Sequence, residues 1–291
     1  MNWFTYALGA TLIYGVINFL YKVGAECGFR SFHLVNIQSV TVAVIAGAIL
    51  LLSGARFPDT AAVLFYAAIN SFFWAAGTSF KISAMKHIPA NVAMPLNKLN
   101  SVFVMLIGII FFADKPSLRQ SAGMVLAVIT LIMLSQKNAS EHAANPGSKS
   151  HRRGVIYILI AGFAIALSMT TGKLAAMNVE KLPYIFVSYL IAAGYTFAAR
   201  KFFLRGEETI CRGKKIKIIL LGIALGALNT AGYYMMLKAW SDGPLSLVQG
   251  IVSLTMIITI ILSAAVYKEK FTPRIAVALA LAVLSAVLIK G

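Results

Sequence analysis

A lysine and several amides lie within a strongly apolar stretch of this sequence. Residues 88–101 read IPANVAMPLNKLNS and lead directly into the apolar run VFVMLIGIIFF. At 100° per residue, Asn91, Lys98 and Ser101 fall on one helix face together with two methionines. Lys98 follows Ala90 by about 12 Å of helix. A cation at that depth predicts a contact for an anionic or carboxylate-bearing ligand. The structural alternative is a lysine that snorkels or packs in neutral form between helices.

A second apolar segment carries a matching pattern. Residues 239–255 read AWSDGPLSLVQGIVSLT, and Ser246, Gln249 and Ser253 share one helix face there. Polar groups that face lipid are costly, so both stripes are expected to face a shared hydrated interior. Pro95 is expected to kink the first helix or to allow gating, because proline removes a backbone hydrogen bond, and Gly250 occupies the matching position in the second.

Aromatic and amide side chains form further stripes at helical spacing. Tyrosine and tryptophan supply stacking area and one hydrogen-bonding atom, which suits an amphipathic ligand, although such stripes more often serve packing. The candidate contacts of this kind are Asn70, Trp74, Thr78, Lys81, Asn229, Tyr233, Tyr14 and Asn18. The hydroxyls of Ser168 and Thr171 are weaker candidates.

These stripes require membrane-spanning helices to position them. The chain has 291 residues, of which 59% are hydrophobic and 12% charged, whereas soluble domains are about a quarter charged. Apolar runs of about 20 residues, long enough to cross a bilayer as a helix, recur throughout. The sequence predicts an all-α membrane protein with ten transmembrane helices, roughly at 3–24, 33–52, 60–86, 90–112, 117–136, 154–177, 182–203, 216–239, 244–266 and 272–290.

The sequence matches itself at a fixed offset. Pro89 falls on Pro244, and Ala76-Gly77 falls on Ala231-Gly232. The predicted organisation is therefore a first five-helix repeat at 1–137, a linker at 138–153 and a second repeat at 154–291. Because five is odd, the second repeat enters the membrane inverted. Inverted repeats are typical of transporters, whose substrate site lies between the halves.

The repeat carries a resemblance to a known family. Each half has an A-x4-P sequence before its fourth span and an acid–lysine pair after it, Asp114-Lys115 and Glu269-Lys270. In these features the chain resembles the EamA family of the drug/metabolite transporter superfamily, which are ten-span inner-membrane permeases. The family often has glycine before the acid, where this chain has Ala113 and Lys268. The resemblance implies alternating access, usually for export.

The positions of the lysines and arginines predict an orientation. Most lie in the loops after odd-numbered spans, and fewer lie at the other side, Lys173 among them. The protein is expected in the cell membrane. Because basic loops stay in the cytoplasm, both termini are expected outside the cytoplasm. Members of the family commonly keep their termini inside, so the two indications conflict. The first helix lacks the features of a signal peptide and is expected to remain.

The sequence lacks the residues that several classes of activity require. All nine Asp and Glu residues fall at predicted helix ends or in loops, which disfavours cation exchange through a buried carboxylate. Asp114 and Glu269 are each expected to pair with neighbouring lysines and to fix a helix end. The sequence has no nucleotide-binding loop, no metal-ligand cluster and no catalytic motif, so neither a cofactor nor an enzyme activity is expected. Gly222 and Gly226 predict close helix packing.

The sequence thus predicts a secondary-active transporter of a small polar or zwitterionic metabolite such as an amino acid. Two alternatives stay open: a carrier of phosphate-bearing or nucleotide-sugar substrates, and a lipid-handling membrane protein without a small-molecule cavity. The expected partners are a small-molecule substrate and membrane lipid, with a homodimer left open. The net charge is +17, but the basic residues lie between apolar spans, so nucleic acid is not an expected partner.

Overall fold

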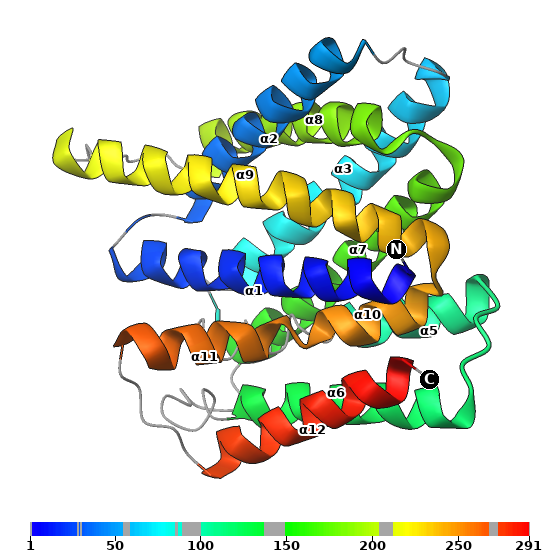
Figure 1. Cartoon of the computed structure of the whole chain (residues 1–291). Coiled ribbons are helices and arrows are strands. Elements are labelled where there is room, and N and C mark those ends of the chain that lie inside the picture. The colour runs from blue at the N-terminus through cyan, green and yellow to red at the C-terminus, as the bar shows by residue number, and fades with distance from the viewer. Residues whose placement is uncertain are drawn as a thin grey trace.

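The computed structural model describes residues 2–27, 29, 31–54, 59–84, 87–88, 100–136, 149–203, 212–267 and 273–290. Within these ranges the regular structure is entirely helical, which confirms the predicted all-α class. The helices, in the order drawn in Figure 1, are α1 Trp3–Glu26, α2 Ser31–Ser53, α3 Thr60–Ala84, α5 Asn100–Phe111, α6 Leu118–Gln136, α7 Lys149–Asn178, α8 Lys181–Phe203, α9 Arg212–Asp242, α10 Leu245–Ser253, α11 Thr255–Tyr267 and α12 Pro273–Lys290.

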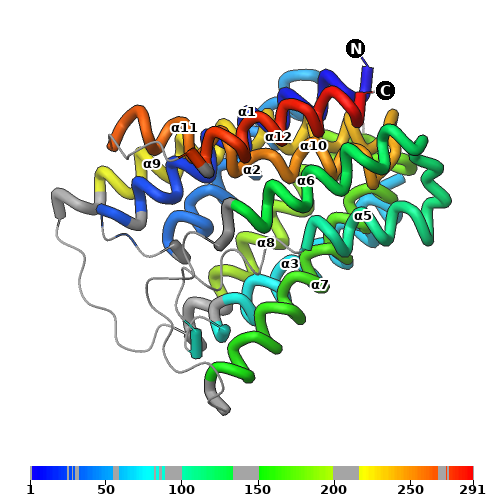
Figure 2. The backbone as a smooth tube through the Cα atoms, turned by 90° about the horizontal axis from the view of Figure 1, so that it is seen from below, coloured from blue at the N-terminus to red at the C-terminus, as the bar shows by residue number. Residues whose placement is uncertain are grey.

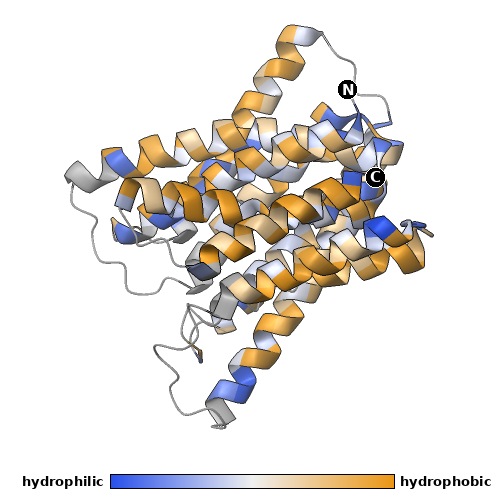
Figure 3. Cartoon of the chain, turned by 60° about the horizontal axis from the view of Figure 1, so that its bottom comes forward, coloured by the Kyte–Doolittle hydropathy of each residue, from blue (hydrophilic) through white to orange (hydrophobic). Residues whose placement is uncertain are grey.

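Many of these helices have the length and the surface of membrane spans. Six segments are long and apolar enough to cross a bilayer: Trp3–Gly24, His33–Ser53, Thr60–Lys81, His151–Asn178, Ile216–Asp242 and Leu245–Tyr267. Shorter apolar helices occupy Asn100–Phe111, Leu118–Met133 and Ile275–Lys290. Large apolar side chains such as Leu52, Phe111 and Phe197 are exposed, as lipid-facing residues would be. Hydrophobic residues predominate along most of the helices in Figure 3. The protein is therefore a multi-pass membrane protein, and the count of ten spans stays a prediction.

The two predicted halves pack mainly against each other. α1 packs along α9 and, in the same way, α7 packs along α3. α2 packs on α9 as α8 packs on α3, while α5 contacts α10 and α6 contacts α12. Replacing every helix by its counterpart in the other half reproduces this set of contacts. Two inverted repeats related by a pseudo-two-fold axis produce that pattern.

Two glycines aligned by the repeat make matching contacts. On α3, a Cβ atom at Gly77 would lie 2.7 Å from Cγ1 of Ile165 on α7. On α9, a Cβ atom at Gly232 would lie 2.9 Å from Cγ2 of Ile13 on α1. Any larger side chain would push these helices apart. The repeat therefore places glycine where each half must approach the other.

The predicted close packing at Gly222 and Gly226 is confirmed. Both glycines lie on the face of α9 that contacts α2. A Cβ atom at Gly222 would lie 2.5 Å from Cγ2 of Ile37, and one at Gly226 would lie 2.4 Å from Cβ of Thr41. The interface of α9 with α2 thus excludes side chains at both positions.

The ninth predicted span is broken, but not at the predicted glycine. The helix runs unbroken through Gly250, and the break falls at Leu254, between α10 and α11. Leu254 has φ −75° and ψ 0°, and its N–H donates to the carbonyl oxygen of Ile251 at 3.1 Å. At Gly250 a Cβ atom would lie 2.9 Å from Cδ1 of Ile289, so this glycine permits contact with α12. Pro95, the other predicted kink, lies outside the described residues.

Both ends of the chain lie at the same end of the bundle (Figures 1 and 2). At this end α1 begins, α9 ends, α10 begins and α12 ends, and we call it the terminus end. Its position relative to the cytoplasm follows only from the charge bias and remains a prediction.

Candidate functional site

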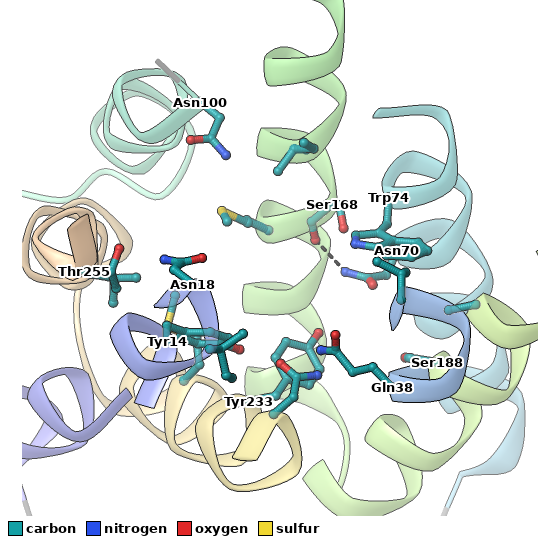
Figure 4. Close-up of a pocket in the computed structure, with 18 of the residues that line it drawn as sticks. Tyr14, Asn18, Gln38, Asn70, Trp74, Asn100, Ser168, Ser188, Tyr233 and Thr255 are labelled. Atoms are coloured by element: carbon teal, nitrogen blue, oxygen red, sulfur yellow. Dashed lines mark hydrogen bonds between the residues drawn. The ribbon is translucent and has the colours of Figure 1, made fainter. Parts of the chain in front are cut away.

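A cavity of about 330 Å³ lies between the two halves. Its walls come from α1, α2, α3 and α5 of the first half and from α7, α8, α9 and α10 of the second, with Thr255 at the start of α11. Figure 4 shows side chains from these helices converging on it. The cavity therefore occupies the position predicted for a substrate site in an inverted-repeat carrier.

Many of the predicted contact residues line this cavity. They come from both halves and from each of the polar stripes: Tyr14, Asn18, Trp74, Ser101, Asn229, Tyr233, Gln249 and Ser253. Asn70 and Ser168 line it as well, and the Nδ2 of Asn70 donates to the carbonyl oxygen of Ser168 at 2.6 Å (Figure 4). Helical periodicity thus identified the inward faces of α1, α3, α9 and α10, while the roles of these residues remain predictions.

Other predicted residues lie elsewhere. Ser246 does not line the cavity and is bound to Asp114 at the terminus end, as described below. Thr78 and Lys81 continue the face of α3 that carries Trp74, but they are not among the lining residues. Asn91, Lys98 and Pro95 lie outside the described residues, so the structure neither places them in the cavity nor removes them from it.

Sequence reasoning missed the contribution of the second and seventh predicted spans. Gln38 and Ser39 of α2 and Ser188 and Tyr189 of α8 line the cavity. Each is one of few polar residues in a long apolar helix, which is the signal that could have found them. Helical phasing places Asn100 off the polar stripe, yet this residue lines the cavity as well. Asn100 and its neighbour Ser101 both border the space at the start of α5.

Tyrosines and amides are joined by hydrogen bonds around the cavity. The Nδ2 of Asn229 donates to the hydroxyl of Tyr189 at 2.5 Å, and the ring of Tyr189 meets that of Tyr233 edge to face at 5.7 Å. The hydroxyl of Tyr21 donates to Oε1 of Gln38. These bonds link α9 to α8 and α1 to α2. They fix the aromatic rings in defined positions around the space that a substrate would fill.

The described lining is mostly apolar, and the polar groups within it are uncharged. Among the residues described at its walls there is no Asp, Glu, Lys or Arg side chain. The described residues also contain no group of His, Cys, Asp and Glu side chains that could hold a metal ion. A ligand in this space would meet amides, hydroxyls and aromatic rings.

Comparison with known proteins agrees with this architecture. The model of the EamA-like transporter family matches residues 1–136 and again residues 152–291. The chain belongs to the EamA-like transporter family. This membership confirms the resemblance noted in the sequence.

Two similar proteins are consistent with this membership. An uncharacterized transporter of Archaeoglobus fulgidus is 25% identical over 172 residues, which are 57% of this chain and 57% of that protein. The match thus spans little more than half of the length of this relative. A protein of known crystal structure is 14% identical and superposes with a TM-score of 0.79 over 99% of this chain and 98% of the other. At that identity the likeness shows the shared fold.

The acid that follows the fourth span in this EamA protein holds the start of α10. Oδ2 of Asp114 accepts hydrogen bonds from the backbone N–H of Ser246 at 2.8 Å and from its hydroxyl at 2.7 Å. The residue that precedes α10, Pro244, makes no side-chain cap, so the carboxylate of a distant segment caps the helix instead. This contact agrees with the prediction that Asp114 fixes a helix end, through the orphan N–H at the start of α10. The carboxylate also acts electrostatically on Lys173 of α7.

Local backbone shape brings Asp114 to this position. Ala113 has φ +53°, a left-handed conformation that glycine adopts without strain, and glycine is the residue that EamA proteins often have there. The N–H of Asp114 donates to the carbonyl oxygen of Gly108 at 3.1 Å. A Cβ atom at Gly108 would lie 2.7 Å from both Oδ2 of Asp114 and the N of Ser246. Glycine at 108 thus permits the contact.

A buried lysine holds the end of α9 at the same corner. Lys173 on α7 is 6% exposed, although the distribution of charge along the sequence predicts a residue that flanks a span. Its Nζ donates to the carbonyl oxygen of Gly243 at 2.7 Å and to that of Trp240. Carbonyls at a helix C-terminus favour a cation. Lys173 and Asp114, with the α9 end and the α10 start that they hold, form what we call the terminus-end clamp.

Asp114→Asn is expected to destabilise the protein by about 1 kcal/mol, because the amide keeps an acceptor but loses the charge that strengthens both bonds to Ser246. Thermal unfolding of the purified protein in nanodiscs measures this loss. Glu26→Gln, at an exposed position at the end of α1, is the control and should not lower the unfolding midpoint. Equal midpoints for the two variants would contradict a capping role for Asp114.

Proposed function

We propose that this EamA protein is a secondary-active transporter of a small polar or zwitterionic metabolite, with an amino acid as the first candidate. The cavity between the halves is the proposed binding site, and alternating access exposes it to each side of the cell membrane in turn. The observation that carries the proposal is a cavity with walls from both repeats, whose described lining combines apolar, aromatic and uncharged polar side chains. Export is the proposed direction.

The size and chemistry of the cavity support this substrate class. A volume of about 330 Å³ is at the small end of the range of ligand pockets, about 300–1,000 Å³. Amide and hydroxyl groups offer donors to a carboxylate, and the rings of Tyr14, Tyr189 and Tyr233 offer faces to an ammonium group. A zwitterion carries both groups with no net charge, so it fits walls whose described residues supply no counter-charge.

The two alternatives find less support. A phosphate ester brings about −1.5 to −2 charges, which proteins usually meet with arginine, lysine or a helix N-terminus. The described cavity residues include no such cation. A lipid-handling protein without a small-molecule cavity would not need Asn18, Asn229 and Gln249 around one cavity.

Uptake by reconstituted vesicles tests the proposal. An equimolar mixture of the twenty ¹³C-labelled amino acids is offered together with a labelled hexose phosphate, and mass spectrometry records what enters. We expect one or a few amino acids to accumulate and the phosphate to stay outside. Accumulation of the hexose phosphate alone would favour the phosphate carrier, and accumulation of nothing would overturn the proposal.

Variants in the same assay assign the site. Asn229→Leu removes the amide that binds Tyr189 and should lower uptake of the transported amino acid at least tenfold. The matched control is Asn178→Leu, at an exposed position near the end of α7, which should leave uptake unchanged. Lys98→Ala tests the cationic contact proposed from the sequence.

A further inference from the structure

Two buried polar atoms at the cavity wall have no hydrogen-bond partner among the described residues. They are the indole Nε1 of Trp240 and the carbonyl Oε1 of Gln249. Both side chains are 2% exposed. The hydroxyl of Ser188 is a third such atom, but a hydroxyl can rotate toward the nearby Tyr184, whereas an indole N–H and an amide oxygen have fixed directions. Buried polar atoms nearly always have a partner, so these two require an explanation.

Hydrogen bonds fix the orientation of the Gln249 amide. Its Nε2 donates to the hydroxyl oxygen of Ser101 at 3.0 Å, and that hydroxyl is 3.4 Å from Oδ1 of Asn100, to which it donates. This chain of donors uses the amide nitrogen, so the oxygen is left as an acceptor. The cavity-lining residue Gln249 therefore keeps an acceptor that no described residue uses.

The indole of Trp240 is held equally firmly. A Cβ atom at Gly172 would lie 2.8 Å from its Cζ3, so α7 packs directly against the ring. The same Gly172 position is 3.5 Å from the hydroxyl of Tyr233, which lines the cavity two turns earlier on α9. The cavity-lining residue Trp240 therefore keeps an N–H that no described residue uses, two turns after Tyr233 on α9.

We propose that Trp240 and Gln249 recognise the head group of an α-amino acid, with the Trp240 N–H donating to the carboxylate and Oε1 of Gln249 accepting from the ammonium group. This inference rests on the proposed function and deepens it. An amine without the carboxylate would leave Trp240 unpartnered, and an acid without the ammonium group would leave Gln249 unpartnered. Either analogue would also bring a net charge to walls that, as far as they are described, carry none.

The pair also connects the substrate to the terminus-end clamp. The carbonyl oxygen of Trp240 accepts from Lys173, and Ser246, one turn before Gln249, is held by Asp114. A substrate bound by the pair therefore contacts the last turn of α9 and the first turns of α10, the two helix ends that the clamp holds. Substrate binding can thus act on the elements that must move when the cavity opens at this end.

Uptake in vesicles, with competition by analogues, tests this assignment. The amino acid that the native protein takes up best from the ¹³C-labelled mixture is used as the probe, and its decarboxylated amine and its deaminated acid are the competitors. Trp240→Phe keeps an aromatic ring and removes only the N–H. Gln249→Leu removes the acceptor. Tyr195→Phe, at an exposed position of α8 that does not line the cavity, is the control.

The two variants should lose recognition of different parts of the ligand's head group. Trp240→Phe should weaken binding of the amino acid and of the acid about tenfold or more, and leave inhibition by the amine as in the native protein. Gln249→Leu should weaken binding of the amino acid and of the amine, and leave inhibition by the acid unchanged. If either variant changes all three ligands equally, or none, the assignment is wrong. If the native protein takes up no amino acid, the proposed function itself fails and this inference fails with it.

Discussion

Replacing Lys173 with methionine is expected to destabilise the protein by about 2–4 kcal/mol and to open the terminus end of the cavity. The Nζ group is buried and donates to the carbonyl oxygens of Trp240 and Gly243. Methionine has a similar length and supplies no donor, so the variant leaves these carbonyls without a partner inside the protein. The last turn of α9 then loses the group that holds it to α7.

The measurement combines thermal unfolding with labelling of a cavity cysteine. Cys27 and Cys211 are first replaced by serine, and Ser253, which lines the cavity, is replaced by cysteine. A membrane-impermeant thiol reagent applied at the terminus end should label this position faster in the Lys173→Met background. Lys115→Met, at an exposed lysine, is the control. A purely stabilising role for Lys173 would lower the unfolding midpoint and leave the labelling rate unchanged.

Helical periodicity predicts which face of each stripe points inward, but not how far along the helix the cavity extends. Gln249, Ser253 and Ser246 share one face of α10, yet only the first two line the cavity. Ser246 lies in the first turn, where an unsatisfied N–H attracts the carboxylate of Asp114. The limit of the cavity is set by a loop of the other half, and the local sequence carries no signal for it.

Lys173 shows the same limitation for charge. The sequence around it, TTGKLAA, resembles the end of a span, so the sequence alone predicts a lysine at a helix flank. Its partners are backbone carbonyls at the end of α9, some seventy residues later in the chain. Backbone groups at helix ends carry no sequence signature, so only the packing of α7 beside α9 reveals why a lysine can be buried there.

The internal repeat is the strongest indicator of the fold because it rests on paired positions. Gly77 and Gly232, which the offset between the two halves aligns, occupy equivalent contacts of α3 with α7 and of α9 with α1. Ala113 stands where the family often has glycine, a difference that the sequence shows but does not explain. In the structure Ala113 has a left-handed backbone conformation. Its backbone conformation explains why glycine is common at that position in relatives.

The contact of α9 with α2 supports the cavity wall, and a single methyl group should disturb it. At Gly226 a Cβ atom would lie 2.4 Å from Cβ of Thr41 and 3.1 Å from the carbonyl oxygen of Gln38, so the backbones must separate. Gly226→Ala is expected to destabilise the protein by about 1–3 kcal/mol, the usual range for an overpacked interior. The same shift displaces Gln38 relative to Asn229, and both line the cavity.

Gly194→Ala provides a matched control for Gly226→Ala. Gly194 lies in the middle of α8, and a Cβ atom there would have no neighbour within 4 Å. Alanine favours a helix over glycine by about 0.5–1 kcal/mol, so this variant should be as stable as the native protein or slightly more stable. Gly226→Ala should therefore lower the unfolding midpoint and amino-acid uptake, whereas Gly194→Ala should leave both unchanged or raise the midpoint slightly. Equal behaviour of the pair would mean that the close approach of α9 to α2 does not support the cavity, since the two substitutions differ only in the space around the added methyl group.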